Sequence, residues 1–128
     1  MAKSKLRILY GEGDEEVLKA QAAIFEKAGH SVQPALGRKA VDEAIRKGAF
    51  DLVMLGATLT RNDRHHLPYM VKKVSTETKV LVMHADGTRH PYVDACTDTG
   101  ASMEAVLNRI EAMNLTGAMR AAAAAAGR

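Results

Sequence analysis

The chain has 128 residues, of which 47% are hydrophobic and 26% charged, values expected of one globular domain with its own core. The net charge of +3 is small, and the cationic residues are interleaved with acidic ones, which disfavours a nucleic-acid-binding protein. No stretch approaches the roughly 20 apolar residues of a membrane span, and no apolar signal region precedes the first strand pattern. The single cysteine, Cys96, excludes an internal disulfide. We therefore expect a cytoplasmic protein.

Short apolar runs alternate with amphipathic stretches along the chain. The first run, Leu6 to Gly11, predicts a buried strand, and Asp14 then stands where the N-cap of a helix belongs; that helix ends near Gly29. Pro34 places the second strand at an edge of the sheet, because proline cannot donate a ladder hydrogen bond. The predicted strands are 6–11, 31–36, 50–55, 79–83 and 92–97.

The later helices are predicted from the same periodicity. The second lies between Gly37 and Gly48, the third spans 67–74 with Pro68 in its first turn, and the last spans 101–113. Strands that alternate with helices in this way predict a parallel α/β sheet. We divide the chain into a domain, 1–113, and an Ala-rich tail, 114–128, which helix propensity alone would make a marginal helix.

One connection is too short for the pattern. Only eight residues separate Met83 from Tyr92, whereas a parallel crossover usually needs a dozen or more. Either a bare loop replaces the fourth helix, which is then shortened or missing, or residues 92–97 form an antiparallel edge strand. Both alternatives leave apolar surface near the fourth and fifth strands, and such surface marks an interaction site. A partner, a homodimer mate or the chain's own Ala-rich tail would cover it.

From Lys5 to about Met113 the chain resembles the receiver domain of two-component response regulators. The segments that carry the resemblance are RILYGEGDEEVL, GAFDLVMLGATLT and TKVLVMHADG. The resemblance implies a flavodoxin-like, doubly wound parallel sheet with strand order 2-1-3-4-5 and helices on both faces.

Receiver chemistry, by this resemblance, requires an acidic pair that holds Mg²⁺, an acceptor aspartate, a hydroxyl residue and a lysine at the carboxyl ends of the strands. The acidic pair corresponds to Glu12 and Gly13, with Asp14 beside them. The acceptor position corresponds to Gly56, which has no side chain to phosphorylate. The hydroxyl position corresponds to His84, and the lysine position falls near Thr99. The sequence therefore predicts that aspartyl phosphorylation is lost and that no Mg²⁺ or other cofactor is required.

Other polar residues have plainer interpretations. Asp51 lies at the amino end of its strand, away from this pocket, and is expected to make a structural contact. Four histidines, at positions 65, 66, 84 and 90, lack the spacing of a metal site. Cys96 has no activating neighbour in the sequence, and the glycines after the first strand lack the spacing of a phosphate-binding loop. We therefore expect neither a resident metal ion nor an enzyme.

These expectations point to a pseudo-receiver that acts without phosphorylation as a protein-interaction module in bacterial signalling. Its partner would be another signalling protein or a homodimer mate, bound through the surface of the fourth and fifth strands, with neither a nucleic acid nor a membrane involved. The alternative is a ligand- or metal-responsive sensor that uses the altered pocket around Glu12, Asp14 and His84.

Overall fold

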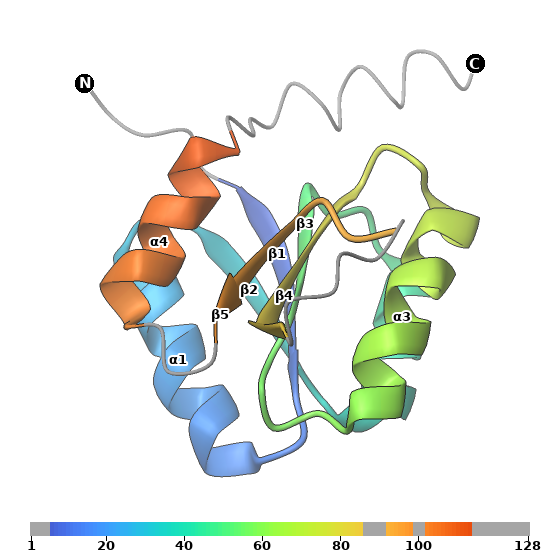
Figure 1. Ribbon diagram of the computed structural model, residues 1–128, viewed down its shortest axis with the longest axis horizontal. Coiled ribbons are helices and arrows are strands. Elements are labelled where there is room, and N and C mark those ends of the chain that lie inside the picture. Colours follow the sequence, from blue (N-terminus) through green and yellow to red (C-terminus); the bar gives the residue numbers. More distant parts are fainter. Residues whose placement is uncertain (1–5, 86–91, 99–101, 114–128) are drawn as a thin grey trace.

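The computed structural model describes residues 6–85, 92–98 and 102–113. They form five strands and four helices (Figure 1). In chain order the elements are β1 (Arg7–Glu12), α1 (Glu15–Lys27), β2 (Ser31–Leu36), α2 (Gly37–Lys47), β3 (Leu52–Leu55), α3 (Arg61–Val74), β4 (Lys79–Ala85), β5 (Ala95–Asp98) and α4 (Met103–Ala112). Within the described ranges, no helix is long and apolar enough to cross a membrane.

All five strands are parallel, in the order β2-β1-β3-β4-β5, and the predicted fold is confirmed. Helices α1 and α4 cover one face of the sheet and α2 and α3 the other (Figure 1). The core has two parts, one on each face of the sheet, because successive side chains of β1 point to opposite faces. Ile8 and Tyr10 pack on the side of α1 and α4, and Leu9 packs on the side of α2 and α3. Strand β2, which contains Pro34, lies at an edge as predicted.

Strand β5 is parallel to β4, which decides the alternative that the sequence left open. Its first residue, Ala95, lies opposite Leu81, so the chain must return about four residues' length along β4 before β5 can begin. Nine residues, 86–94, make this return. Of these, residues 92–94 are described and contain no helix, whereas 86–91 lie outside the described ranges.

Asp94 fixes the start of β5. Its backbone amide donates to Val80 O at 2.9 Å, and its Oδ2 accepts from the Val80 amide and from Lys72 Nζ, both at 2.8 Å. Lys72 also donates to Thr78 O at 2.8 Å, which joins α3 to the start of β4. This network holds the short return against the sheet.

Several predicted boundaries were wrong. Strand β3 begins at Leu52 and not at residue 50, and β4 ends at Ala85, two residues later than predicted. Helix α3 begins at Arg61, six residues before the predicted start, so Pro68 lies inside the helix and not in its first turn. Its true start is fixed by Thr60, whose side chain accepts from the Asp63 amide at 3.1 Å. Pro68 is tolerated there because it is buried against the core, where packing offsets the lost backbone hydrogen bond.

Two further errors lie near the carboxyl end of the domain. Strand β5 spans Ala95–Asp98, not 92–97, because the preceding residues form the return that Asp94 anchors. Helix α4 spans Met103–Ala112 after an N-cap at Ser102, which is shorter than the predicted 101–113. The predicted tail, 114–128, lies outside the described residues.

We expect Asp94→Ala to lower the free energy of unfolding by about 1–3 kcal/mol, because the Val80 amide loses its acceptor and Lys72 its counterion. The matched control is Asp42→Ala, whose side chain is similarly exposed (32% against 28%) but pairs with Arg46 on the surface of α2. That control should cost about 0.5 kcal/mol or less in urea unfolding. Equal losses for the two variants would contradict the role given to Asp94.

Candidate functional site

The polar residues that the sequence singled out gather where β1 and β3 end. Glu12 is the last residue of β1, followed by Gly13 and by Asp14, the N-cap of α1. Gly56 directly follows β3, and its amide donates to Gly11 O at 2.8 Å. Parallel strands that are hydrogen-bonded neighbours bring these two carboxyl ends together.

The Glu12 carboxylate is buried at this edge of the sheet, with 1% of the residue exposed. Its Oε1 accepts from the Thr58 amide at 3.0 Å and from the Thr58 hydroxyl at 2.6 Å. Its Oε2 accepts from the hydroxyl of Tyr10, which also lies against the Gln21 side-chain oxygen. A buried charge is costly unless it is hydrogen-bonded, and here both carboxylate oxygens have donors.

Gly56 has no side chain, and the Glu12 carboxylate lies where one would be. A Cβ built on Gly56 would approach Cδ, Oε1 and Oε2 of Glu12 more closely than 3.0 Å, a separation that real Cβ atoms essentially never breach. The backbone of Gly56 is not left-handed, since only Gly29 and Gly37 among the described glycines have a positive φ. While hydrogen bonds hold the Glu12 carboxylate here, space and not backbone conformation disfavours a side chain at position 56, and any side chain there requires Glu12 to move.

Gly13 is constrained by the loop after β3. A Cβ on Gly13 would collide with the carbonyl oxygen of Thr58. The Thr58 hydroxyl accepts from the amides of Gly13 and Asp14 at 2.8 and 3.0 Å, so the two loops are tied by the same side chain that donates to Glu12. A second carboxylate cannot stand at position 13 without moving this loop.

Asp14 acts as the predicted N-cap, since its Oδ1 accepts from the Val17 amide at 3.0 Å. The residues present do not fit a Mg²⁺ ion, which needs several exposed oxygen ligands. Glu12 is enclosed by donors, Asp14 caps a helix, and Gly13 and Gly56 offer no side-chain oxygen. Across the described ranges, no group of three or more His, Cys, Asp or Glu residues could hold a metal ion.

The remaining predicted residues are only partly brought to this site. His84 is the penultimate residue of β4, the strand next to β3, which places its backbone near the same edge. Strand β5 ends at Asp98, and Thr99 lies outside the described residues, as does His90. His65 and His66 lie on α3. Asp51 precedes β3 at the opposite end and accepts from the Arg7 amide at 2.9 Å, a structural contact of the expected kind.

Sequence reasoning missed three members of the network: Tyr10, Gln21 and Thr58. Tyr10 could have been found, because residues two apart on a strand share a face and Tyr10 precedes Glu12 by two. Gln21 and Thr58 depend on how α1 and the loop after β3 pack over the strand ends. No local pattern in the sequence carries that information.

Burial, and then the hydrogen bond to the Glu12 carboxylate, raise the pKa of Tyr10 above its ordinary value. As the pH rises through about 10, the unfolded chain therefore loses this proton while the folded chain keeps it. Below about pH 10 the titration of Tyr10 should not change the free energy of unfolding. Above that pH it should lower the free energy of unfolding by up to about 1.4 kcal/mol per pH unit. Urea unfolding from neutral to alkaline pH should show a smaller fall for Tyr10→Phe. Parallel profiles for the two proteins would show that Tyr10 is not held protonated.

No family model matches the sequence, and no curated protein is significantly similar to it. Solved structures do match. A CheY-like receiver domain protein from Methanospirillum hungatei gives a TM-score of 0.75 at 20% identity, over 86% of this chain and 94% of its own. The non-phosphorylated HemR receiver domain from Leptospira biflexa gives 0.72 at 23%, over 84% and 93%. An adenylate cyclase chain from Rhodopirellula baltica gives 0.74 at 14%, over 84% and 86%. The chain therefore has the fold of response-regulator receiver domains.

Proposed function

We propose that this chain is a cytoplasmic pseudo-receiver, which has no catalytic activity and presents a fixed surface to another signalling protein. The receiver fold supports the class, and the resemblance in sequence assigns the acceptor position to Gly56, the residue that directly follows β3. The observation that carries the proposal is that the Glu12 carboxylate fills the space of any side chain at position 56.

The chemistry of phosphoryl transfer explains why this matters. A carboxylate that attacks phosphorus must be accessible, and a divalent ion and a cation must neutralise the developing charge on the oxygens. Glu12 is the carboxylate nearest the acceptor position, but it is buried and accepts hydrogen bonds at both oxygens. It is therefore a structural group and not a substitute acceptor.

The same contacts support a fixed conformation. Glu12 joins the Tyr10 hydroxyl on its own strand to Thr58 in the loop before α3, and the Tyr10 hydroxyl also lies against the side-chain oxygen of Gln21 on α1. A buried network whose members are all hydrogen-bonded rigidifies the elements that it joins. The domain would then keep one arrangement of its strand ends, and its output would depend on the presence of its partner.

The interaction surface that we propose lies at β4 and β5, where the short return replaces a full crossover. The partner would be a signalling protein or a second copy of the chain. The sensor alternative, with a ligand held around Glu12, Asp14 and His84, is not favoured, because both oxygens of Glu12 already accept hydrogen bonds and Asp14 caps α1.

Thermal melting in Mg²⁺ with and without beryllofluoride tests the proposal. A ligand that binds only the folded state increases the free energy of unfolding, by about 2.7 kcal/mol at a hundredfold excess over Kd. The melting temperature rises accordingly. We expect no shift for this chain, and no phosphoryl adduct in its intact mass after incubation with acetyl phosphate. A receiver that retains its acceptor aspartate, melted in parallel, should be stabilised. A comparable shift for this chain would overturn the proposal.

A further inference from the structure

Two tyrosine rings lie exposed and in contact on the α2 and α3 side of the molecule. Tyr69 of α3 and Tyr92 of the return before β5 are 41% and 39% exposed, and their ring centroids are 5.5 Å apart in an edge-to-face arrangement. The His66 ring lies 6.1 Å from that of Tyr69. The two large aromatic rings are thus held together at the surface. Exposed aromatic side chains of this kind are enriched in protein interfaces.

The pair is held in place from both sides. Tyr69 is fixed by the helix, and Tyr92 stands two residues before Asp94, whose carboxylate is bound by Lys72 of the same helix and by the Val80 amide. A partner would therefore meet a surface whose backbone is already ordered, which lowers the entropic cost of binding.

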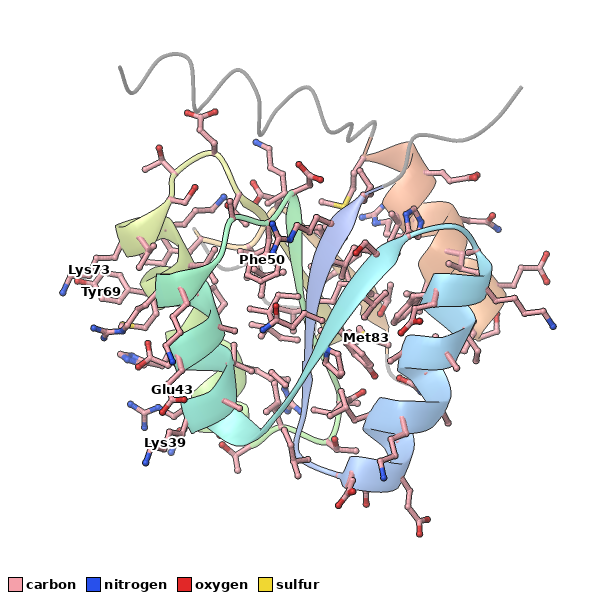
Figure 2. The ribbon with its side chains drawn as sticks, turned by 180° about the vertical axis from the view of Figure 1, so that it is seen from behind. Lys39, Glu43, Phe50, Tyr69, Lys73 and Met83 are labelled. Carbon is pink, nitrogen blue, oxygen red and sulfur yellow. The ribbon has the colours of Figure 1, made fainter. Side chains whose placement is uncertain are left out.

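The charge of the molecule is divided between its two faces. Helices α2 and α3 carry eight Lys and Arg residues against three acidic residues, whereas α1 and α4 carry three against five. Figure 2 shows Lys39 and Glu43 of α2 and Tyr69 and Lys73 of α3 projecting from the same outer side. Within the described part of the chain, neither Lys39 nor Lys73 forms an ion pair.

We infer that this surface, which carries the tyrosine pair and Lys73 beside α3 and extends over the outer side of α2 to Lys39, binds an acidic segment of a partner protein that carries apolar anchors. An aromatic centre with a charged rim is the usual anatomy of a protein interface, and cations at the rim favour a negatively charged partner. The inference rests on the proposed function and moves the binding surface from β4 and β5 themselves to the outer side of α3 and α2, next to the return before β5.

Charge also decides against two other occupants. A symmetric dimer through this face would bring two cationic surfaces together. A nucleic acid would place phosphates against Glu43 and the other carboxylates that stand among the cations. A protein segment can place acidic residues against the cations and basic residues against the carboxylates of this surface.

The test is selection of a phage-displayed library of random peptides against the full chain. We expect the selected peptides to combine Asp or Glu with aromatic or large aliphatic residues. Tyr69→Ala, and separately the double variant Lys39→Glu/Lys73→Glu, should weaken their binding by about tenfold or more, and added salt should weaken it further. The matched control, Lys19→Glu/Lys27→Glu on α1, should leave binding within about twofold. All five substituted positions are exposed, so melting temperatures should stay close to that of the parent.

Several results would overturn the inference: no enriched peptide, enrichment of neutral or basic peptides, or equal losses in the α1 control. Displacement of the peptides by single-stranded oligothymidylate would indicate a nucleic-acid surface instead. The inference and the proposed function fail separately. Stabilisation by beryllofluoride would refute the proposed function without affecting peptide selection, whereas failed selection would leave the account of Gly56 intact.

Discussion

The arrangement of the strand ends depends on the hydrogen bonds of one buried carboxylate, that of Glu12. Removed from water, this group is stabilised by the donors that surround it, the Tyr10 hydroxyl and the amide and hydroxyl of Thr58. The donors come from two parts of the fold, Tyr10 on β1 and Thr58 in the loop after β3, so satisfying Glu12 fixes the end of β1 against that loop. The absence of side chains at Gly13 and Gly56 is the steric condition for that arrangement.

Gly13 and Gly56 have a structural role in this arrangement. Considered alone, each is a lost carboxylate at a position that receiver chemistry would use. Considered with Glu12, they are the residues that allow a buried carboxylate and the Thr58 loop to close over the strand ends. The loss of the reaction that we propose and the fixed arrangement of the strand ends would then have the same steric origin. The exposed pair formed by Tyr69 of α3 and Tyr92 of the return before β5 lies away from this site, so recognition there can proceed without any chemistry at the strand ends.

The sequence predicted the sheet well, because buried parallel strands are short apolar runs and their order followed from the resemblance. It failed at α3, where the polar residues from Arg61 onward suggested a loop and Pro68 suggested a helix start, and packing of Leu67 and Val71 decided otherwise. At the site it identified Glu12 and Gly56 but not their contact. That contact depends on how Glu12 turns back over the end of β3, which only the folded chain defines.

The steric contact between Glu12 and position 56 is tested most directly by a double-mutant cycle in urea unfolding. Gly56→Ala in the parent chain should cost about 1–3 kcal/mol, because the new methyl group meets the Glu12 carboxylate. In a Glu12→Ala background that space is open, and Gly56→Ala should cost about nothing or stabilise slightly. The predicted result is a coupling free energy of about 1 kcal/mol or more between the two positions. Equal costs in the two backgrounds would contradict the account.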